Sequence, residues 1–290
     1  MALKILTDSG CDLPEDIIKE YDIYVFPILV IEDNKEYLDG VTIKPKTLYD
    51  NMREGKYYKT SQIPPNAFEE KFEEIAKKGE SAIYIAFSSG LSATYQSAVL
   101  TRDSLKEKYP DLDLTIVDSK AASLGFGLIV YKAAQMAKEG KSKEEILNML
   151  DFYIENMDHV FTVDDLEYLF RGGRVTRTQA FVGGLLNIKP ILDVTEEGKL
   201  RPLEKVRGRG KVLKRMLELM DERAKEADLS KQVIGISHGD DMDKVMKLKN
   251  MIEEKYKVRE FVINHIGCAI GAHAGPGTIA LFFMKKNYEE

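Results

Sequence analysis

A buried strand is predicted at Ala82-Ile83-Tyr84-Ile85-Ala86-Phe87, and it runs directly into Ser88-Ser89-Gly90-Leu91-Ser92-Ala93-Thr94. The first six residues are apolar or β-prone, which is typical of a strand inside a sheet. A helical pattern follows the second stretch and ends before Pro110. A strand that leads through a turn into a helix is the start of a βαβ unit, so the sequence predicts an α/β fold.

Similar units extend from this segment toward both ends of the chain. The expected strands are 3–6, 23–31, 114–117, 160–163, 188–194, 200–206, 232–237, 258–266 and 278–284, and the expected helices include 45–53, 66–78, 142–157 and 165–170. Pro27 interrupts 23–31 and predicts an edge or bulged strand there. Ser142 and Glu145 form a capping-box pattern. The stretches 188–194 and 200–206 flank a short polar turn and predict an antiparallel hairpin. We therefore expect two directly packed domains, 1–155 and 156–290.

Composition limits the function. Of the 290 residues 44% are hydrophobic and 31% charged, and the net charge of −6 disfavours nucleic acid and anionic membrane as main partners. The two cysteines, Cys11 and Cys268, form no metal-ligand spacing and predict free thiols in a reducing compartment. No stretch resembles a signal peptide or a membrane span, so a cytoplasmic protein is expected.

The hydroxyl-rich turn is the first candidate site. Ser88, Ser89, Ser92 and Thr94 offer neutral donors, and backbone N–H groups at a helix start favour an anion such as a carboxylate. Helix capping by serine explains the same residues equally well. A nucleophilic Ser92 is the third interpretation. However, Gly90-Leu91-Ser92-Ala93-Thr94 lacks the closing glycine of the G-x-S-x-G motif, and no histidine follows in an obvious triad order.

Other motifs point away from cofactors. Phosphate-loop and dinucleotide fingerprints are absent, and the histidines lack metal-ligand spacing, so no metal and no cofactor is expected. Most of the histidines suit structural roles, but His273 is a candidate for ligand contact. It lies among Gly267, Gly271, Gly275 and Gly277, and a tight glycine-rich loop before a strand can direct a ring into a cleft.

Basic residues gather in two places. Arg171 and Arg174 belong to one cluster, and Arg207 to the other. Solvated surface charge is the simpler explanation for both clusters. Guanidinium groups also bind phosphate oxygens in pairs, so a docking or phosphate-contact surface is the functional alternative.

In combination, these segments resemble the DegV family of bacterial fatty-acid-binding proteins. The resemblance rests on motifs in a fixed order along the whole chain: Thr7-Asp8-Ser9 with Asp12-Leu13-Pro14, Thr60-Ser61-Gln62, Ser88-Ser89-Gly90-Leu91-Ser92 with Thr94-Tyr95, Val117-Asp118-Ser119, Leu166-Glu167-Tyr168-Leu169 with Arg171-Gly172-Gly173-Arg174, Leu186-Asn187-Ile188-Lys189-Pro190, Lys205-Val206-Arg207-Gly208, and Ile270-Gly271-Ala272-His273-Ala274-Gly275-Pro276-Gly277. Each motif alone is weak, but their order is specific.

The resemblance implies two different α/β domains, a three-layer parallel-sheet domain and a mixed-sheet two-layer domain, with a ligand tunnel between them. It implies a long-chain fatty acid such as palmitate, stearate or oleate as ligand, a transient membrane contact, and a separate ATP-dependent fatty acid kinase that phosphorylates the carboxylate for phospholipid synthesis. The residues that it implicates are Thr60, Ser61, Ser92 and His273 for the carboxylate, Ser89, Gly90, Thr94 and Gly275 as support, and Arg171, Arg174 and Arg207 toward the kinase.

The chain departs from the family pattern in a few positions. Gly10-Cys11 replaces a more usual pair, Ile63-Pro64-Pro65 lengthens a turn, and Ala93 stands where glycine is common. None of these removes a hydroxyl of the expected head-group site. A fatty-acid carrier without catalytic residues is therefore the expectation. The alternatives are a serine-dependent lipid esterase or acyltransferase that uses Ser92, and a nucleic-acid-binding regulator that uses the basic clusters.

Overall fold

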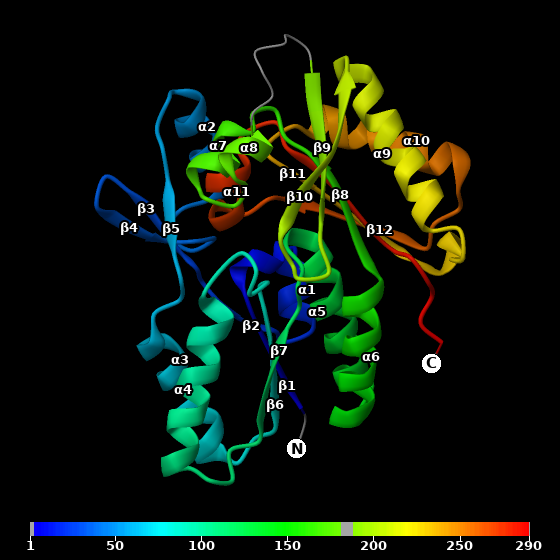
Figure 1. Ribbon diagram of the computed structural model, residues 1–290. Helices are drawn as coiled ribbons and strands as arrows, with labels where there is room; N and C mark the ends of the chain where they lie inside the picture. Colours follow the sequence, from blue (N-terminus) through cyan, green and yellow to red (C-terminus); the bar gives the residue numbers. More distant parts are fainter. Residues whose placement is uncertain (1–2, 181–187, 290) are drawn as a thin grey trace.

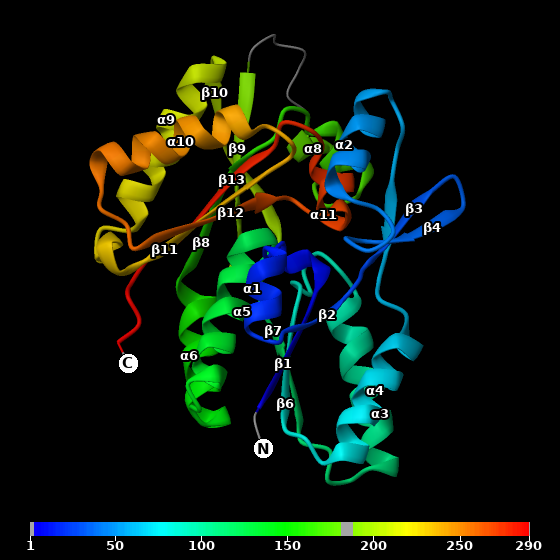
Figure 2. The same cartoon turned by 180° about the vertical axis from the view of Figure 1, so that it is seen from behind.

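The structure is a computed structural model, and it describes residues 3–180 and 188–289. Figure 1 shows a parallel sheet with its helices in the lower half of the molecule and a larger sheet in the upper half; Figure 2 shows the same arrangement from behind. The α/β class expected from the sequence is confirmed.

The first sheet consists of four parallel strands. In spatial order they are β2 (Tyr24–Phe26), β1 (Lys4–Asp8), β6 (Ala82–Ala86) and β7 (Leu114–Asp118). The predicted strand at 82–87 is thus confirmed as a central, fully buried strand. Because side chains alternate along a strand, Tyr84 packs in the cluster of Phe68 and Phe72, whereas Ile83 and Ile85 pack in a second cluster on the opposite face.

Helices cover both faces of this sheet, which makes the expected three layers (Figure 1). One face carries α3 (Pro65–Lys78) and α4 (Thr94–Lys108), and the other carries α1 (Glu15–Glu20), α5 (Ser123–Lys138) and α6 (Lys143–Asn156), while η1 (Ser9–Cys11) follows β1. The predicted capping box is present, because Ser142 and Glu145 satisfy each other's backbone N–H groups at the start of α6. Pro65 opens α3, and Gly79 ends it with φ 60°, a conformation that suits glycine.

A small antiparallel sheet corrects two expectations. Its strands are β4 (Lys35–Leu38), β3 (Leu29–Glu32) and β5 (Lys59–Ser61), and α2 (Pro45–Arg53) precedes β5. The stretch 23–31 is therefore two strands in two sheets, because Pro27 has no N–H to continue the ladder. Thr60 and Ser61 pair with Val30 and Leu29 of β3, so they lie in a strand that the expected strands did not include.

The second large sheet is mixed. Its spatial order is β10 (Leu200–Arg207), β9 (Ile188–Val194), β8 (Met157–Thr162), β13 (Ile279–Met284), β11 (Val233–His238) and β12 (Glu260–His265). Only β11 and β12 pair in parallel among these described strands. The hairpin predicted at 188–206 is confirmed as β9 and β10.

Helices α9 (Arg209–Arg223) and α10 (Met242–Lys255) cover one face of the mixed sheet. Along the chain, the short helix η2 (Leu229–Lys231) lies between them, and α7 (Glu167–Arg171) and α8 (Arg177–Ala180) follow β8. The opposite face packs on α5, since Phe161 and Phe282 share a core cluster with Leu124, Phe126 and Leu128 of that helix. Helix α5 thus lies between the two sheets. The parallel sheet ends before residue 119 and the mixed sheet starts at Met157. A domain boundary at residue 155 stays a prediction.

His273 lies in a helix, α11 (Cys268–Ala274), and the glycine-rich turn expected from the sequence is confined to the residues after it, where Gly275 and Gly277 have positive φ. Its glycine at 271 serves close packing: a methyl group there would lie 2.6 Å from Tyr49 Oη and 2.9 Å from Leu48. Glycine therefore reflects a neighbouring helix rather than a turn at this position.

Candidate functional site

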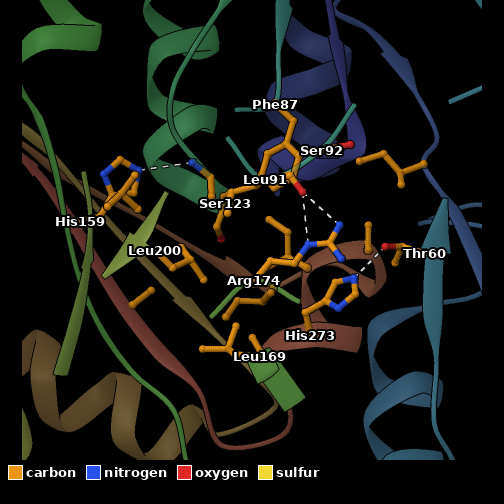
Figure 3. A pocket seen from close by; sticks show the side chains of 18 of the residues that line it. Thr60, Phe87, Leu91, Ser92, Ser123, His159, Leu169, Arg174, Leu200 and His273 are labelled. Atoms are coloured by element: carbon orange, nitrogen blue, oxygen red, sulfur yellow. Dashed lines mark hydrogen bonds between the residues drawn. The ribbon is translucent and has the colours of Figure 1, made fainter. Parts of the chain in front are cut away.

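One pocket of about 780 Å³ lies between the two sheets. Its wall comprises Ile28, Thr60, Ser61, Gln62, Phe87, Ser89, Leu91, Ser92, Ala93, Gln96, Ala122, Ser123, His159, Phe161, Leu169, Arg174, Val194, Leu200, Ile266, Ala269, Ile270, His273, Ala274, Thr278, Ala280 and Phe282. Polar side chains gather at one side, where Figure 3 shows Thr60, His273 and Arg174 together, with His159 across the pocket. The pocket therefore has a polar end and a largely apolar remainder.

Exposure of the lining residues shows which end opens. Ser61, Ala93 and Gln96, near the polar end, are exposed. In contrast, Phe161 and Phe282 are buried, with 9% and 2% exposure. A ligand with a polar head and an apolar tail would therefore keep its head near the mouth and its tail in the closed part.

Thr60 and His273 form the centre of the polar end. Thr60 Oγ1 lies 2.7 Å from His273 Nε2, and the donor depends on the tautomer of the ring. Strand β5 supplies Thr60, whereas α11 supplies His273. Ring atom Nδ1 faces the backbone of Gly172, where a methyl group would overlap it. Two residues predicted from the sequence are thus brought into direct contact.

Burial and the nearby Arg174 lower the pKa of His273 to about 3. The unperturbed value is 6.5, so the imidazole stays neutral throughout the physiological range. A neutral ring supplies one donor and one acceptor, which is suited to orienting a carboxylate in a hydroxyl network.

Ser92 is another polar residue of the wall. Its Oγ lies 2.9 Å from Thr94 Oγ1 and accepts a hydrogen bond from the Thr94 backbone N–H at 3.2 Å. Among the described residues no histidine hydrogen-bonds to Ser92. His273, the histidine at the polar end of the pocket, is bonded to Thr60. The arrangement lacks the serine–histidine hydrogen bond that activates a nucleophilic serine.

The prediction that residues 88–92 present free backbone N–H groups is wrong. These donors are satisfied internally, because Ser88 donates to Ala121, Ser89 to Asp118, Gly90 to Ser88 Oγ, and Leu91 and Ser92 to the Ser88 carbonyl. Helix α4 begins only at Thr94, so the turn folds on itself before the helix starts. Residues 88–92 therefore offer a ligand no free backbone N–H group, and Ser92 offers its side-chain hydroxyl.

The residues expected to support the head group have varied surroundings. Ser89 lines the pocket, but its hydroxyl donates to Asp118 at 2.5 Å. Gly90 lies outside the wall, and a methyl group there would meet the carbonyl of Glu197 in the β9–β10 hairpin at 2.6 Å. Gly275 has φ 81° and packs on the ring of Tyr168. Thr94 is buried, and its hydroxyl contacts that of Ser92.

The three arginines differ in position. Arg174 lines the pocket and donates to the carbonyls of Leu91, at 3.0 and 3.2 Å, and Gly172. Burial lowers the pKa of its guanidinium, which nevertheless stays charged as arginine does in proteins. Arg174, which the family resemblance assigned to kinase contact, thus places a positive charge in the pocket wall.

Arg171 and Arg207 lie outside the pocket wall. Arg171 lies over the exposed Tyr57 ring at 4.4 Å and pairs with Glu167 at 2.7 Å. Arg207 ends β10, whereas Leu200 at the other end of that strand lines the pocket, so the two lie roughly 23 Å apart along the strand. The structure brings Arg174, but not Arg207, to the candidate site.

Several wall residues carried no signal in the sequence. His159 is 5% exposed, and its Nε2 accepts a hydrogen bond from the Ala122 backbone N–H at 3.4 Å. Burial lowers the pKa of His159 to about 3, so it too is neutral. Leu91 and Leu169 come from a turn and a short helix. No periodic pattern marks such residues as pocket-lining, because the tertiary fold alone brings them together.

Within residues 3–180 and 188–289, no cluster of three or more potential ligands for a metal ion occurs. None of the helices described has the length and apolar character needed to cross a membrane. Both cysteines are buried and unpaired.

Comparisons with known proteins agree with this geometry. The model of the family described as "Uncharacterised protein, DegV family COG1307" matches residues 2–286. A DegV domain-containing protein of Clostridium perfringens is 44% identical over 97% of this chain and 96% of its own. A fatty-acid-binding DegV family protein of Thermus thermophilus is 31% identical, with a TM-score of 0.88 over 97% of this chain and 99% of its own. A stearic-acid-binding protein of Eubacterium ventriosum is 25% identical, with a TM-score of 0.88 over 97% and 98%.

Fold and site together define an α/β protein whose two large sheets and one small sheet enclose a pocket with one polar end. This chain belongs to the DegV family.

Proposed function

We propose that this protein binds a long-chain fatty acid, such as palmitate, stearate or oleate, and that the pocket between the two sheets is the binding site. The observation that supports this most is the division of the pocket into a polar mouth and a buried apolar remainder. Its volume of about 780 Å³ suits a long chain. Solved relatives described as fatty-acid-binding proteins support the same ligand class.

Energetics favour such a ligand. Burial of a chain the length of palmitate contributes roughly 12 kcal/mol gross, at about 0.8 kcal/mol per CH₂. Lost freedom on association takes back several kcal/mol. The carboxylate requires donors, since a buried unpaired charge is expelled or protonated. In the proposal, Thr60, Ser61, Ser92 and His273 supply them, and the charged Arg174 favours an anion at this end.

The protein then acts as a carrier and not as an enzyme. A hydrolase would need a base beside Ser92, but the partner of Ser92 is Thr94. A carrier keeps the tail out of water while the head stays near the mouth. We propose that a separate ATP-dependent fatty acid kinase in the cytoplasm receives the exposed head, that the acyl phosphate serves phospholipid synthesis, and that loading involves a transient membrane contact.

The residues proposed for kinase contact are Arg171, Arg174 and Arg207. Kinase contact is best supported for Arg171, because its side chain is 48% exposed. Arg174 would act from inside the mouth. Arg207 would require the kinase to reach far along β10.

Titration calorimetry with palmitate and with methyl palmitate tests the proposal. Ser92→Ala and His273→Ala should weaken palmitate binding about 10- to 100-fold, because each removes a hydrogen bond to a charged group. Methyl palmitate binding should change much less. The control is Ser104→Ala, an exposed serine of α4 that is not part of the pocket wall. Failure of the unmodified protein to bind palmitate would refute the proposal.

A further inference from the structure

Two buried aspartates contact the helix that carries His273 without lining the pocket. Asp12 follows η1 and Asp39 follows β4, and they are 6% and 3% exposed. Neither belongs to the pocket wall. Buried carboxylates are costly, so their place in the fold requires a physical reason.

Both carboxylates bind the start of α11. Asp12 accepts the backbone N–H of Gly267 at 2.8 Å, and Asp39 accepts those of Cys268 and Ala269 at 2.8 and 3.1 Å. The first N–H groups of a helix have no partner within the helix. Here carboxyl oxygens from the N-terminal part of the chain satisfy three consecutive ones.

The carboxylates are themselves held from the other side. Ser123 donates to Asp12 at 2.5 Å, and Ser9 donates to Asp39 at 2.9 Å. A methyl group at Gly267 would lie 2.6 Å from Asp12 Oδ1, so the backbone approaches the carboxylate as closely as glycine allows. The start of α11 therefore has little freedom to shift.

Further bonds fix the same segment. The Asn264 side chain donates to the Asp12 carbonyl at 2.9 Å, and Tyr49 Oη donates to the Ile266 carbonyl at 3.0 Å. Helix α11 is short, and it presents Ala269, Ile270 and His273 to the pocket. A change at its first turn is thus transmitted directly to the ring that meets Thr60.

Asp8 provides a comparison within the same region. It is fully buried, but it accepts from Phe87 N, Gly10 N and Tyr84 Oη, at 2.9, 3.1 and 2.9 Å. No described hydrogen bond links Asp8 to α11. Asp8 holds β1, β6 and the turns that follow them together, whereas Asp12 and Asp39 hold α11.

We propose that Asp12 and Asp39 are positioning residues for the head-group site: by fixing the start of α11 they set the place of His273 opposite Thr60. The inference rests on the proposed function, because it gives these residues a role through carboxylate binding. Neither aspartate touches the ligand. Functional side chains depend on such supporting contacts to hold their geometry.

Asp39→Asn is the sharpest test, because an amide replaces one acceptor by a donor that must face Cys268, Ala269 or Ser9. Binding of palmitic acid and of hexadecanol is measured, and the ratio of the two affinities reports the head-group site alone. We expect this ratio to fall about 10-fold in Asp39→Asn, since one hydrogen bond to the charged head is impaired. Hexadecanol affinity should stay within about 2-fold.

Asp8→Asn is the matched control. It removes an equally buried carboxylate and should lower stability toward urea, yet its palmitic acid to hexadecanol ratio should equal that of the unmodified protein. An unchanged ratio in Asp39→Asn, or an equal fall in both variants, would overturn the inference. An unmodified protein that does not prefer the acid would instead overturn the proposed function.

If Asp39→Asn does not fold, Ser9→Ala takes its place. That change removes a hydrogen bond that orients the Asp39 carboxylate, and leaves the carboxylate present. The ratio should fall in the same direction by a smaller factor. An unchanged ratio in Ser9→Ala would then count against the inference.

Discussion

Thr60 and His273, 213 positions apart in the sequence, meet with 2.7 Å between Oγ1 and Nε2. The first comes from an edge strand of the small sheet and the second from a helix that is held by carboxylates of the N-terminal part of the chain. Their contact joins segments from both ends of the chain at the mouth of one pocket.

Thr60→Val tests this contact with almost no change of volume. Removal of the hydroxyl leaves His273 Nε2 without its partner and the proposed carboxylate without one donor. We expect palmitate affinity to fall about 10-fold, a loss near 1.4 kcal/mol. Calorimetry measures the change. A variant that binds palmitate as well as the unmodified protein would show that the hydroxyl is not part of the site.

Gly172→Ala should disturb the same ring from behind. The added methyl group would overlap His273 Nδ1, and the ring would have to move away from Thr60. Palmitate affinity should fall at least as much as in Thr60→Val. Gly210→Ala is the matched control, because no atom lies within 4 Å of the added methyl group there. Equal affinity in the two glycine variants would contradict the close packing of Gly172 on His273.

Gly125→Ala should shorten the closed part of the pocket. Its methyl group would overlap His159 and lie 2.8 Å from Phe282, and both of these residues line the pocket. Displacement of either ring into the cavity favours shorter acyl chains, although alanine suits a helix better than glycine. Affinities for a series of saturated acids, compared with Gly210→Ala, measure the shift. An unchanged chain-length optimum would place the tail elsewhere.

The neutral His159 predicts a specific pH dependence of stability. Its pKa falls from 6.5 when unfolded to about 3 when folded, so the unfolded chain takes up a proton first as the pH drops. Its contribution is complete above pH 6.5 and is lost progressively between pH 6.5 and 3. Burial raises the pKa of Asp8 to about 7, which opposes this trend, so the effect must be isolated by mutation.

The His159→Gln variant separates the contribution of His159 from that of Asp8. Between pH 7 and pH 5 the unmodified protein should lose about 2 kcal/mol of unfolding free energy more than the variant. Urea unfolding at the two pH values measures both. Parallel pH profiles would mean that His159 titrates normally in the folded protein.

Local patterns predicted much of the fold. The strand at 82–87 alternates correctly between two cores, Ser142 caps α6 as its spacing indicates, and the hairpin at 188–206 follows from its turn. Local rules failed where a neighbour decides the conformation. The glycines near His273 predicted a loop. Gly275 and Gly277 do form a turn, but Gly271 lies in a helix, where Tyr49 and Leu48 leave no room for a side chain.

The candidate site could be predicted from the sequence only in part. Hydroxyl residues and a histidine marked the polar end, and the order of motifs indicated the family. Neither periodicity nor spacing could show that Arg174 faces the pocket, or that Asp12 and Asp39 support α11, because these contacts link segments far apart in the chain. The same limit hid the internal hydrogen bonds of the 88–92 turn, which leave no N–H for a ligand.

Mass spectrometry of the purified protein under native conditions, with solvent extraction of whatever is bound, tests the central claim most directly. We expect one long-chain fatty acid per protein molecule, and a reduced occupancy in Ser92→Ala and His273→Ala. A protein that is empty as purified, and that also takes up no added palmitate, stearate or oleate, would contradict the account.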